Sequence, residues 1–365
     1  MPSETVAAVR GKDPRCRWET VTGARDFNDG SRFGSSRVID LDALPMRIAL
    51  GQFNELTDEQ LAFVKQCGCD DVLLNTPKLP GDERWEYEDL LAWRERAEAA
   101  GLRLVALENV PVKFYDQIML GTPERDRQLE NMQATVRNMG RAGIPILGYH
   151  WMPNSVWRTA WEAPVRGGAL STGFNLSEAD QSKLTHGRVY SEDELWANYD
   201  WYLERMLPVC EEVGVRMALH PDDPPVESLG GIPRLFRNFE NFQRAMTVHD
   251  SPMHGLDYCH GCWSEMRGGD GVLESIRWFG ERGKLFYIHF RDVVGKADDF
   301  VEVFLGDGNV DPVAVMKTLK EVGFKGFIID DHVPRMVNDT RWGHRGRAWT
   351  TGYLHALLTA VNSLS

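Results

Sequence analysis

The sequence has no long hydrophobic run, few cysteines and no excess of basic residues. No run of about 18 apolar residues occurs, so we expect no membrane-spanning helix and no membrane partner. The first residues, MPSETVAAVR, lack the apolar core that a secretory signal needs. Six cysteines in 365 residues are too sparse for a disulfide framework, which indicates a reducing compartment. We therefore expect a cytoplasmic protein.

The charge balance excludes one class of partner. The chain has 41 Lys and Arg against 54 Asp and Glu, which gives a formal net charge of -13. Binding to a phosphate backbone requires a basic surface, so we expect no nucleic acid partner. No GxGxxG motif stands where a strand-like segment meets a helical one, which weighs against a dinucleotide-binding domain. With 42% hydrophobic and 26% charged residues, the chain has the composition of a folded globular protein.

After residue 45, short apolar segments alternate with amphipathic ones. Eight apolar segments have the length and composition of strands, and nearly all precede a helical segment. The predicted strands are 46–53, 70–75, 103–110, 144–151, 216–221, 254–259, 285–290 and 326–331. Helix starts are predicted at the capping boxes Thr57-x-x-Gln60 and Ser191-x-x-Glu194, at Thr122-Pro123-Glu124 and at Asp311-Pro312.

This alternation predicts a parallel sheet, and eight repeated units favour a closed α/β barrel, the (β/α)8 TIM barrel. The alternative is a doubly wound sheet with a second, smaller domain. Residues 1–45 are polar and without periodicity, and we expect an N-terminal arm there, followed by one barrel domain over 46–365. Residues 152–190 form a long insertion after the fourth strand, which we expect to act as a lid or as a contact with a neighbouring subunit.

Side chains that bind metal ions gather where the last four strands end. In a barrel these carboxyl ends form one rim, where active sites lie. The residues there are His220, Asp222, Asp223, Asp257, Cys259, His260, Cys262, His289, Arg291, Asp292, Asp330, Asp331 and His332. Any one of these histidines could be structural, and Cys259 alone could be a small core residue. Imidazole, thiolate and carboxylate groups from four neighbouring strands instead predict a site for a divalent ion such as Mn, Fe, Co or Zn.

The remaining cysteines and histidines lack this context. The pair Cys67 and Cys69 falls at a helix-to-strand turn, which places it at the opposite rim of a barrel, and Cys210 falls in an apolar helical stripe. Structural roles are expected for these three cysteines. Surface or packing roles are expected for His186, His249 and His355. For Arg291 two interpretations stay open: an ion pair with a barrel carboxylate such as Asp292, or a contact with substrate.

At these same residues the sequence resembles the D-mannonate dehydratases of hexuronate catabolism, specifically their metal-dependent, xylose-isomerase-like barrel type. The resemblance covers nearly all of the chain from strand 4 onward, and LHPDDPP is its most specific motif. The matching segments are MPNSVWRT (152–159), LHPDDPP (219–225), IPR (232–234), GLDYCHG (255–261), HFRDV (289–293), LGDGNVDPVAVMKTLKEVGFKG (305–326) and DDH (330–332).

The resemblance implies a site and an activity. It assigns His220, Cys259, His289 and Asp331 as ligands of Mn²⁺ or Fe²⁺. It implies that His332 transfers a proton and that Arg158 meets the substrate. The implied reaction is the dehydration of D-mannonate, or of a close sugar-acid analogue, to 2-keto-3-deoxy-D-gluconate, catalysed by a homo-oligomer.

The sequence also departs from the family pattern. It has Asp330-Asp331-His332-Val333 where Pro-Asp-His-Gly is usual, and His260 and Cys262 where Thr and Ser are usual. A tyrosine that assists the family reaction is missing from 333–350, and we expect His344 to take its place.

Three other functions remain possible on sequence grounds. A metal-dependent sugar isomerase or epimerase needs the same ion and base. A noncatalytic barrel would bind sugar acids without turnover. A nuclease is disfavoured by the acidic charge.

Overall fold

The computed structural model describes residues 39–364. The expected N-terminal arm falls outside the described residues except for 39–45, which contain a short 3-10 helix, η1 (Leu41–Ala43). Asp40 caps this helix by accepting hydrogen bonds from the backbone of Asp42 and Ala43. Among the helices of the described part of the chain, none is long and apolar enough to cross a membrane.

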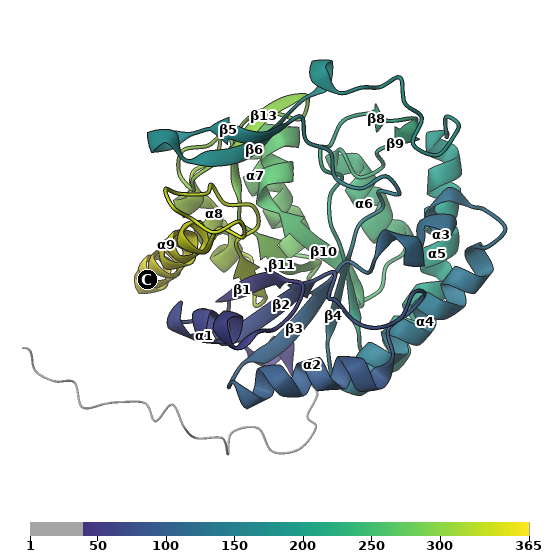
Figure 1. Ribbon diagram of the computed structural model, residues 1–365, viewed down its shortest axis with the longest axis horizontal. Helices are drawn as coiled ribbons and strands as arrows, with labels where there is room; N and C mark the ends of the chain where they lie inside the picture. Colours follow the sequence, from purple (N-terminus) through teal and green to yellow (C-terminus); the bar gives the residue numbers. More distant parts are fainter. Residues whose placement is uncertain (1–38, 365) are drawn as a thin grey trace, which may run out of the picture. The chain divides into compact units, whose positions relative to one another are not determined.

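Eight parallel strands close into a barrel, which confirms the predicted fold class (Figure 1). Around the barrel the strand order is β1-β14-β11-β10-β7-β4-β3-β2. The strands are β1 (Arg47–Phe53), β2 (Asp71–Asn75), β3 (Arg103–Glu108), β4 (Ile146–Tyr149), β7 (Arg216–Leu219), β10 (His254–Cys259), β11 (Leu285–His289) and β14 (Phe327–Ile329). Each lies inside the segment that its apolar run predicts, because fully buried parallel strands require continuous apolar sequence.

Helices surround the barrel and connect its strands. They are α1 (Asp58–Gln66), α2 (Tyr87–Ala99), α3 (Asp116–Leu120), α4 (Arg125–Ala142), α5 (Glu192–Val213), α6 (Phe239–Val248), α7 (His260–Gly280), α8 (Pro312–Glu321) and α9 (His344–Ser363), with 3-10 turns η2 (Val112–Phe114), η3 (Arg166–Gly168) and η4 (Leu176–Glu178). Both predicted capping boxes are present, at the starts of α1 and α5. Asp311 caps α8, and Pro312 is its first residue, as predicted.

The predicted helix start at Thr122-Pro123-Glu124 is wrong by a few residues. The backbone N–H of Thr122 donates to Gln117 and so completes the C-terminal turn of α3. The left-handed conformation of Gly121, with φ 66°, allows this turn. Helix α4 therefore begins only at Arg125.

A second sheet stands outside the barrel, and the sequence analysis missed it. Its antiparallel order is β12-β13-β6-β5, built from β12 (Asp292–Lys296), β13 (Asp299–Val303), β6 (Leu170–Asn175) and β5 (Ala160–Pro164). We call it the outer sheet. Strands β5 and β6 come from the 152–190 insertion, whereas the hairpin β12–β13 follows β11 directly. Figure 1 shows β5, β6 and β13 together at one edge of the molecule. A third pair, β8 (Ser228–Leu229) and β9 (Ile232–Pro233), forms a short hairpin.

Three apolar clusters hold these layers together. The largest lies between the barrel and the surrounding helices. A smaller cluster contains barrel residues such as Ala49, Val105 and Phe327. The third lies at the outer sheet and joins Phe174 and Phe300 to Val226 and Leu229. The outer sheet is therefore packed on an apolar base of its own, which holds it above the carboxyl ends of β4 and β11.

Candidate metal centre and active site

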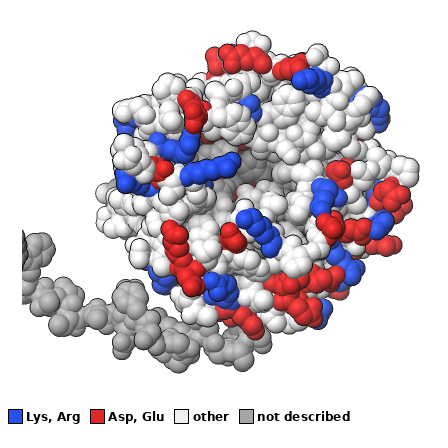
Figure 2. Space-filling view, viewed as in Figure 1, with Lys and Arg blue, Asp and Glu red and all other residues white. Residues whose placement is uncertain are grey.

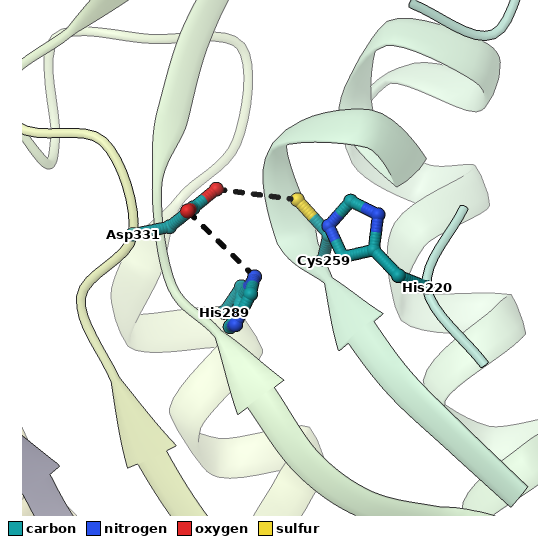
Figure 3. Close-up of side chains that lie close together, drawn as sticks. All are labelled: His220, Cys259, His289 and Asp331. Atoms are coloured by element: carbon teal, nitrogen blue, oxygen red, sulfur yellow. Dashed lines mark hydrogen bonds and ion pairs between the residues drawn. The ribbon is translucent and has the colours of Figure 1, made fainter. Parts of the chain in front are cut away.

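Four side chains converge at the carboxyl ends of neighbouring barrel strands (Figure 3). His220 follows β7, Cys259 ends β10, His289 ends β11 and Asp331 follows β14. One potential ligand atom from each residue lies within 4.8 Å of the others. His220 is partly exposed, and the other three are buried. The structure thus brings together the four residues that the resemblance implies as ligands.

The two imidazole rings are oriented by contacts outside the group. Nδ1 of His220 lies 2.7 Å from the carbonyl oxygen of Pro221 and must donate to it, which leaves Nε2 for the centre. Nε2 of His289 lies 2.7 Å from Glu108, which leaves Nδ1. That Nδ1 is buried and has no hydrogen-bond partner within residues 39–364. In metal-binding histidines, a hydrogen bond made by one ring nitrogen determines that the other ring nitrogen binds the metal. Both histidines have such a hydrogen bond, so the four side chains fit a metal ion.

The charges of the four groups also suit a divalent cation. Burial would raise the pKa of both the Cys259 thiol and the Asp331 carboxyl. A hydrogen bond with Cys262 and the charge of Arg291 nevertheless lower the pKa of Cys259, and the charges of His332 and His289 lower the pKa of Asp331. For His220, burial and neighbouring charge act on the pKa in the opposite directions. Burial would lower the pKa of His220, but the charge of Asp257 and interactions with Cys259 outweigh it and raise that pKa to about 10. The surrounding negative charge that favours these protons equally favours a bound cation.

Arg291 and Gln52 contact the donor side chains. Nε of Arg291 lies 3.3 Å from the Cys259 sulfur and 3.1 Å from Asp331. A Cβ on Gly261 would come within 2.6 Å of the Arg291 side chain, so glycine there leaves room for it. Gln52, with a positive φ of 59° at the end of β1, donates to Asp331 at 2.8 Å. The thiolate and the carboxylate are therefore held in place from two sides.

Two other groups of donor atoms occur among the described residues, and both are less suited to a cation. The first group contains Glu108, Asp257 and His289. Its Glu108 carboxylate already accepts hydrogen bonds from His289 and from Asn75. Asp223, Cys262 and Glu265 form the other. Its centre already holds a cation, because Nη2 of Arg291 lies 3.0 Å from the Cys262 sulfur and 3.2 Å from both carboxylates.

A network of charged side chains, most of them buried, borders the four-residue donor group. It contains Arg158, Asp223, Arg291, Glu302 and His332, and we call it the charge network. Nδ1 of His332 lies 2.7 Å from Glu302, and its Nε2 lies 3.6 Å from Asp331. Strand β14 ends at Ile329. Residues 330–332 lie beyond the strand, so their side chains need not alternate between opposite faces. Asp330 pairs with Arg347 on α9, whereas Asp331 and His332 both face the site.

Arg158 lies in this network, but the structure leaves it no donor for a substrate. Its Nε donates to Thr172 at 3.2 Å, and Nη1 donates to Asp223 and to the carbonyl of Trp157. Nη2 donates to Asp223 and to Glu302. The side chain is only 1% exposed. All five N–H groups thus have protein partners, so the expected direct contact with substrate gains no support from the structure.

The structure also answers the question left open for Arg291 and shows what the unusual residues His260 and Cys262 contact. Arg291 does pair with barrel carboxylates, but the suggested partner Asp292 is wrong. The Asp292 side chain instead accepts from the backbone of Val293, Gly306 and Gly308. The unusual residues His260 and Cys262 both contact Arg291, through its carbonyl and its Nη2 respectively.

His344 lies apart from the metal centre. It begins α9, where its Nδ1 is 2.6 Å from the Thr340 hydroxyl and its ring packs against Phe63 and Trp342. None of these contacts belongs to the charge network or to the ligand set. The structure therefore gives no support to His344 as a replacement for the family tyrosine.

Sequence reasoning missed two carboxylates of the site. Glu108 is the last residue of β3, and the rule that selects carboxyl ends of strands would have found it. Glu302 lies on β13, within a hairpin that no strand–helix rhythm predicts.

Charged residues of both signs are interspersed on the face shown in Figure 2, and no continuous basic surface appears there.

A closed parallel barrel with His, Cys and Asp donors at four neighbouring strand ends defines a class of metal-dependent enzymes that act on small molecules. The model of the family described as D-mannonate dehydratase (UxuA) matches residues 46–189 and 180–365. The chain belongs to this family, whose members are hydro-lyases.

Individual relatives agree with the family model. Mannonate dehydratase 2 of Halalkalibacterium halodurans is 30% identical over 354 residues, covering 87% of this chain and all of that protein. Mannonate dehydratase of Thermotoga maritima is 32% identical over 304 residues, covering 74% of this chain and 82% of that protein. The crystal structure of mannonate dehydratase from Streptococcus suis superposes with a TM-score of 0.79 at 28% identity, covering 88% and 94% of the two chains. An L-ribulose 3-epimerase structure, at TM-score 0.57 and 15% identity, shares the fold alone.

Proposed function

We propose that this protein dehydrates D-mannonate, or a close sugar-acid analogue, to the 2-keto-3-deoxy acid, with Mn²⁺ or Fe²⁺ held by His220, Cys259, His289 and Asp331. The observation that carries the proposal is the buried donor group with its partnerless Nδ1 on His289, in a chain of this family. Mixed imidazole, thiolate and carboxylate ligands suit a borderline divalent ion.

The reaction breaks the C2–H bond and expels the C3 hydroxyl, after which the enol tautomerises to the keto acid. A divalent ion at this site supplies positive charge that stabilises the negative charge developing beside C2. The protein must add a group that moves protons, because both the C2 proton and the leaving hydroxyl need a partner.

His332 is the side chain placed for that task. Its Nδ1 faces Glu302, so its Nε2 is the ring nitrogen that remains for the substrate. The side chain is 41% exposed, unlike Glu302 at 1%, so the substrate can reach it. We assign Nε2 of His332 to take the C2 proton or to protonate the leaving hydroxyl. Arg158 is a positioning residue in this account, because its donors hold Asp223 and Glu302.

The substrate is tested by incubating the Mn²⁺-loaded protein with a panel of aldonic and uronic acids. We expect a 2-keto-3-deoxy acid from D-mannonate or one close stereoisomer, loss of this activity on chelation, and recovery with Mn²⁺ or Fe²⁺. Rearranged sugars without loss of water would instead establish an isomerase or epimerase. Binding of sugar acids without any product would establish the noncatalytic alternative.

The insertion is proposed to cover the site mouth and to become better ordered when substrate binds. It supplies Arg158 to the charge network and Thr172, which donates to Glu302. Its exposed Lys183 and Arg188 offer tryptic sites in a segment without strands. Trypsin cleavage after these two residues should slow several-fold with saturating sugar acid, whereas cleavage elsewhere should not change. Equal cleavage rates with and without the acid would favour a subunit contact over a lid.

Two broader features complete the proposal. We propose a reducing compartment such as the cytoplasm, which is supported by the free thiols of Cys67, Cys69, Cys210, Cys259 and Cys262. We also propose that the protein forms a homo-oligomer. Trp161 on β5 and Val337 are 67% and 76% exposed, and the ion pair of their neighbours Glu162 and Arg335 brings these segments together. We propose that these two exposed apolar side chains form part of the contact between subunits.

A further inference from the structure

Glu302 is a buried carboxylate that enters the site from outside the barrel. It lies on β13 of the outer sheet, and its side chain is 1% exposed. It is neither among the four ligand residues nor part of a barrel strand. A buried carboxylate is costly unless several donors satisfy it, so its partners indicate its task.

Four donors surround Glu302. Its Oε1 lies 2.7 Å from Arg158, 2.7 Å from Arg291 and 2.7 Å from Nδ1 of His332. The hydroxyl of Thr172 donates to Oε2. Guanidinium groups can only donate, so Glu302 accepts at every one of these contacts as an ionised carboxylate.

This arrangement determines which nitrogen of His332 carries the proton. A carboxylate that only accepts requires an N–H on Nδ1, so the lone pair of a neutral ring lies on Nε2. Nε2 is also the nitrogen that faces Asp331 and the metal centre. A histidine held by a buried carboxylate in this way is the arrangement that orients the base in hydrolytic triads.

We propose that Glu302 is the positioning residue of the reaction: it fixes His332 in the Nδ1-protonated form and directs Nε2 at the substrate. This inference rests on the proposed dehydration, in which His332 moves the proton. It also assigns the outer sheet a part in the reaction. β13 contributes Glu302, while the insertion contributes Thr172 and Arg158, which hold the carboxylate in place.

The kinetic test compares wild type with Glu302→Gln and Glu302→Asp in the Mn²⁺-loaded protein. Gln keeps the shape of the side chain but removes its charge, and we expect kcat to fall by about 10²-fold with KM and metal content nearly unchanged. Asp keeps the charge and should restore part of kcat. The matched control is Glu98→Gln, which removes another arginine–glutamate pair, with Arg94 on α2, and should leave kcat unchanged.

The second readout does not depend on activity or on a variant. In wild-type protein loaded with diamagnetic Zn²⁺, the ¹⁵N signals of the His332 ring should show a protonated Nδ1 and a bare Nε2, with His332→Asn providing the assignment. The opposite tautomer in wild type would overturn the inference, even if Glu302→Gln failed to fold. So would a Glu302→Gln protein with wild-type kcat. A wild-type protein that shows this tautomer but does not dehydrate any sugar acid would refute the proposed function instead.

Discussion

Cys259→Ser and His289→Ala should each lose the bound metal ion and, with it, essentially all turnover. Each removes one of four donors in a buried group, and neither serine nor alanine replaces a thiolate or an imidazole as ligand. We expect metal content to fall from about one ion per chain to near zero after dialysis, and kcat to fall by about 10³-fold or more. Elemental analysis of the purified variants measures the first quantity, and steady-state kinetics the second.

The matched control is Cys210→Ser. Cys210 is also buried, but it lies in the apolar face of α5, away from the rim. This variant should keep its metal ion and differ from wild type only in stability. Full metal content in both Cys259→Ser and His289→Ala would eliminate the proposed ligand set.

His332→Asn should have the opposite signature, with full metal content and little turnover. His332 contacts Glu302 and Asp331 but is not one of the four donors. Asparagine can still donate to Glu302 but cannot exchange a proton near neutral pH, so we expect kcat to fall by about 10²–10⁴-fold. Kinetics and elemental analysis on the same preparation separate this result from loss of the ion.

The control for this variant is His249→Asn, because His249 also pairs with a carboxylate, Asp200, at 2.9 Å. Wild-type turnover in a metal-loaded His332→Asn protein would show that His332 only supports its neighbours.

The barrel and the gathering of donor side chains at its rim could be predicted from the sequence because both depend on local patterns. Apolar runs determine where the strands lie, and the residue that follows each run must stand at the catalytic rim. This rule places His220, Cys259, His289 and Asp331 at the rim together with nine other residues, and only the resemblance to the family selects these four. Their side chains converge only because the eight strands close, so the fold prediction and the site prediction support each other.

The charge network could not be predicted in the same way. Its ion pairs join residues far apart in the sequence, such as Arg158 with Glu302, and they depend on how the outer sheet pairs. Sequence adjacency suggests Asp292 as the partner of Arg291, but the Asp292 side chain accepts from backbone N–H groups. His344 is the expected replacement for the missing family tyrosine, but its ring packs on Phe63 of α1. Sequence proximity does not determine side-chain direction once a strand has ended.

The departure at Asp330 has a physical account. Where the family usually has proline, this carboxylate is buried and pairs with Arg347 of α9 at 2.9 Å. Burial raises the pKa of Asp330 to about 6, and Arg347 acts against this. The ion pair attaches the exit of β14 to the last helix, which leaves Asp331 free to face the metal centre.

The most direct test is the position of the metal ion in a crystal of the wild-type protein soaked with Mn²⁺. An anomalous difference map should show one peak within bonding distance of Nε2 of His220, the Cys259 sulfur, Nδ1 of His289 and the Asp331 carboxylate. A peak instead among Asp223, Cys262 and Glu265, or beside Glu108 and Asp257, or no peak at all, would contradict the account.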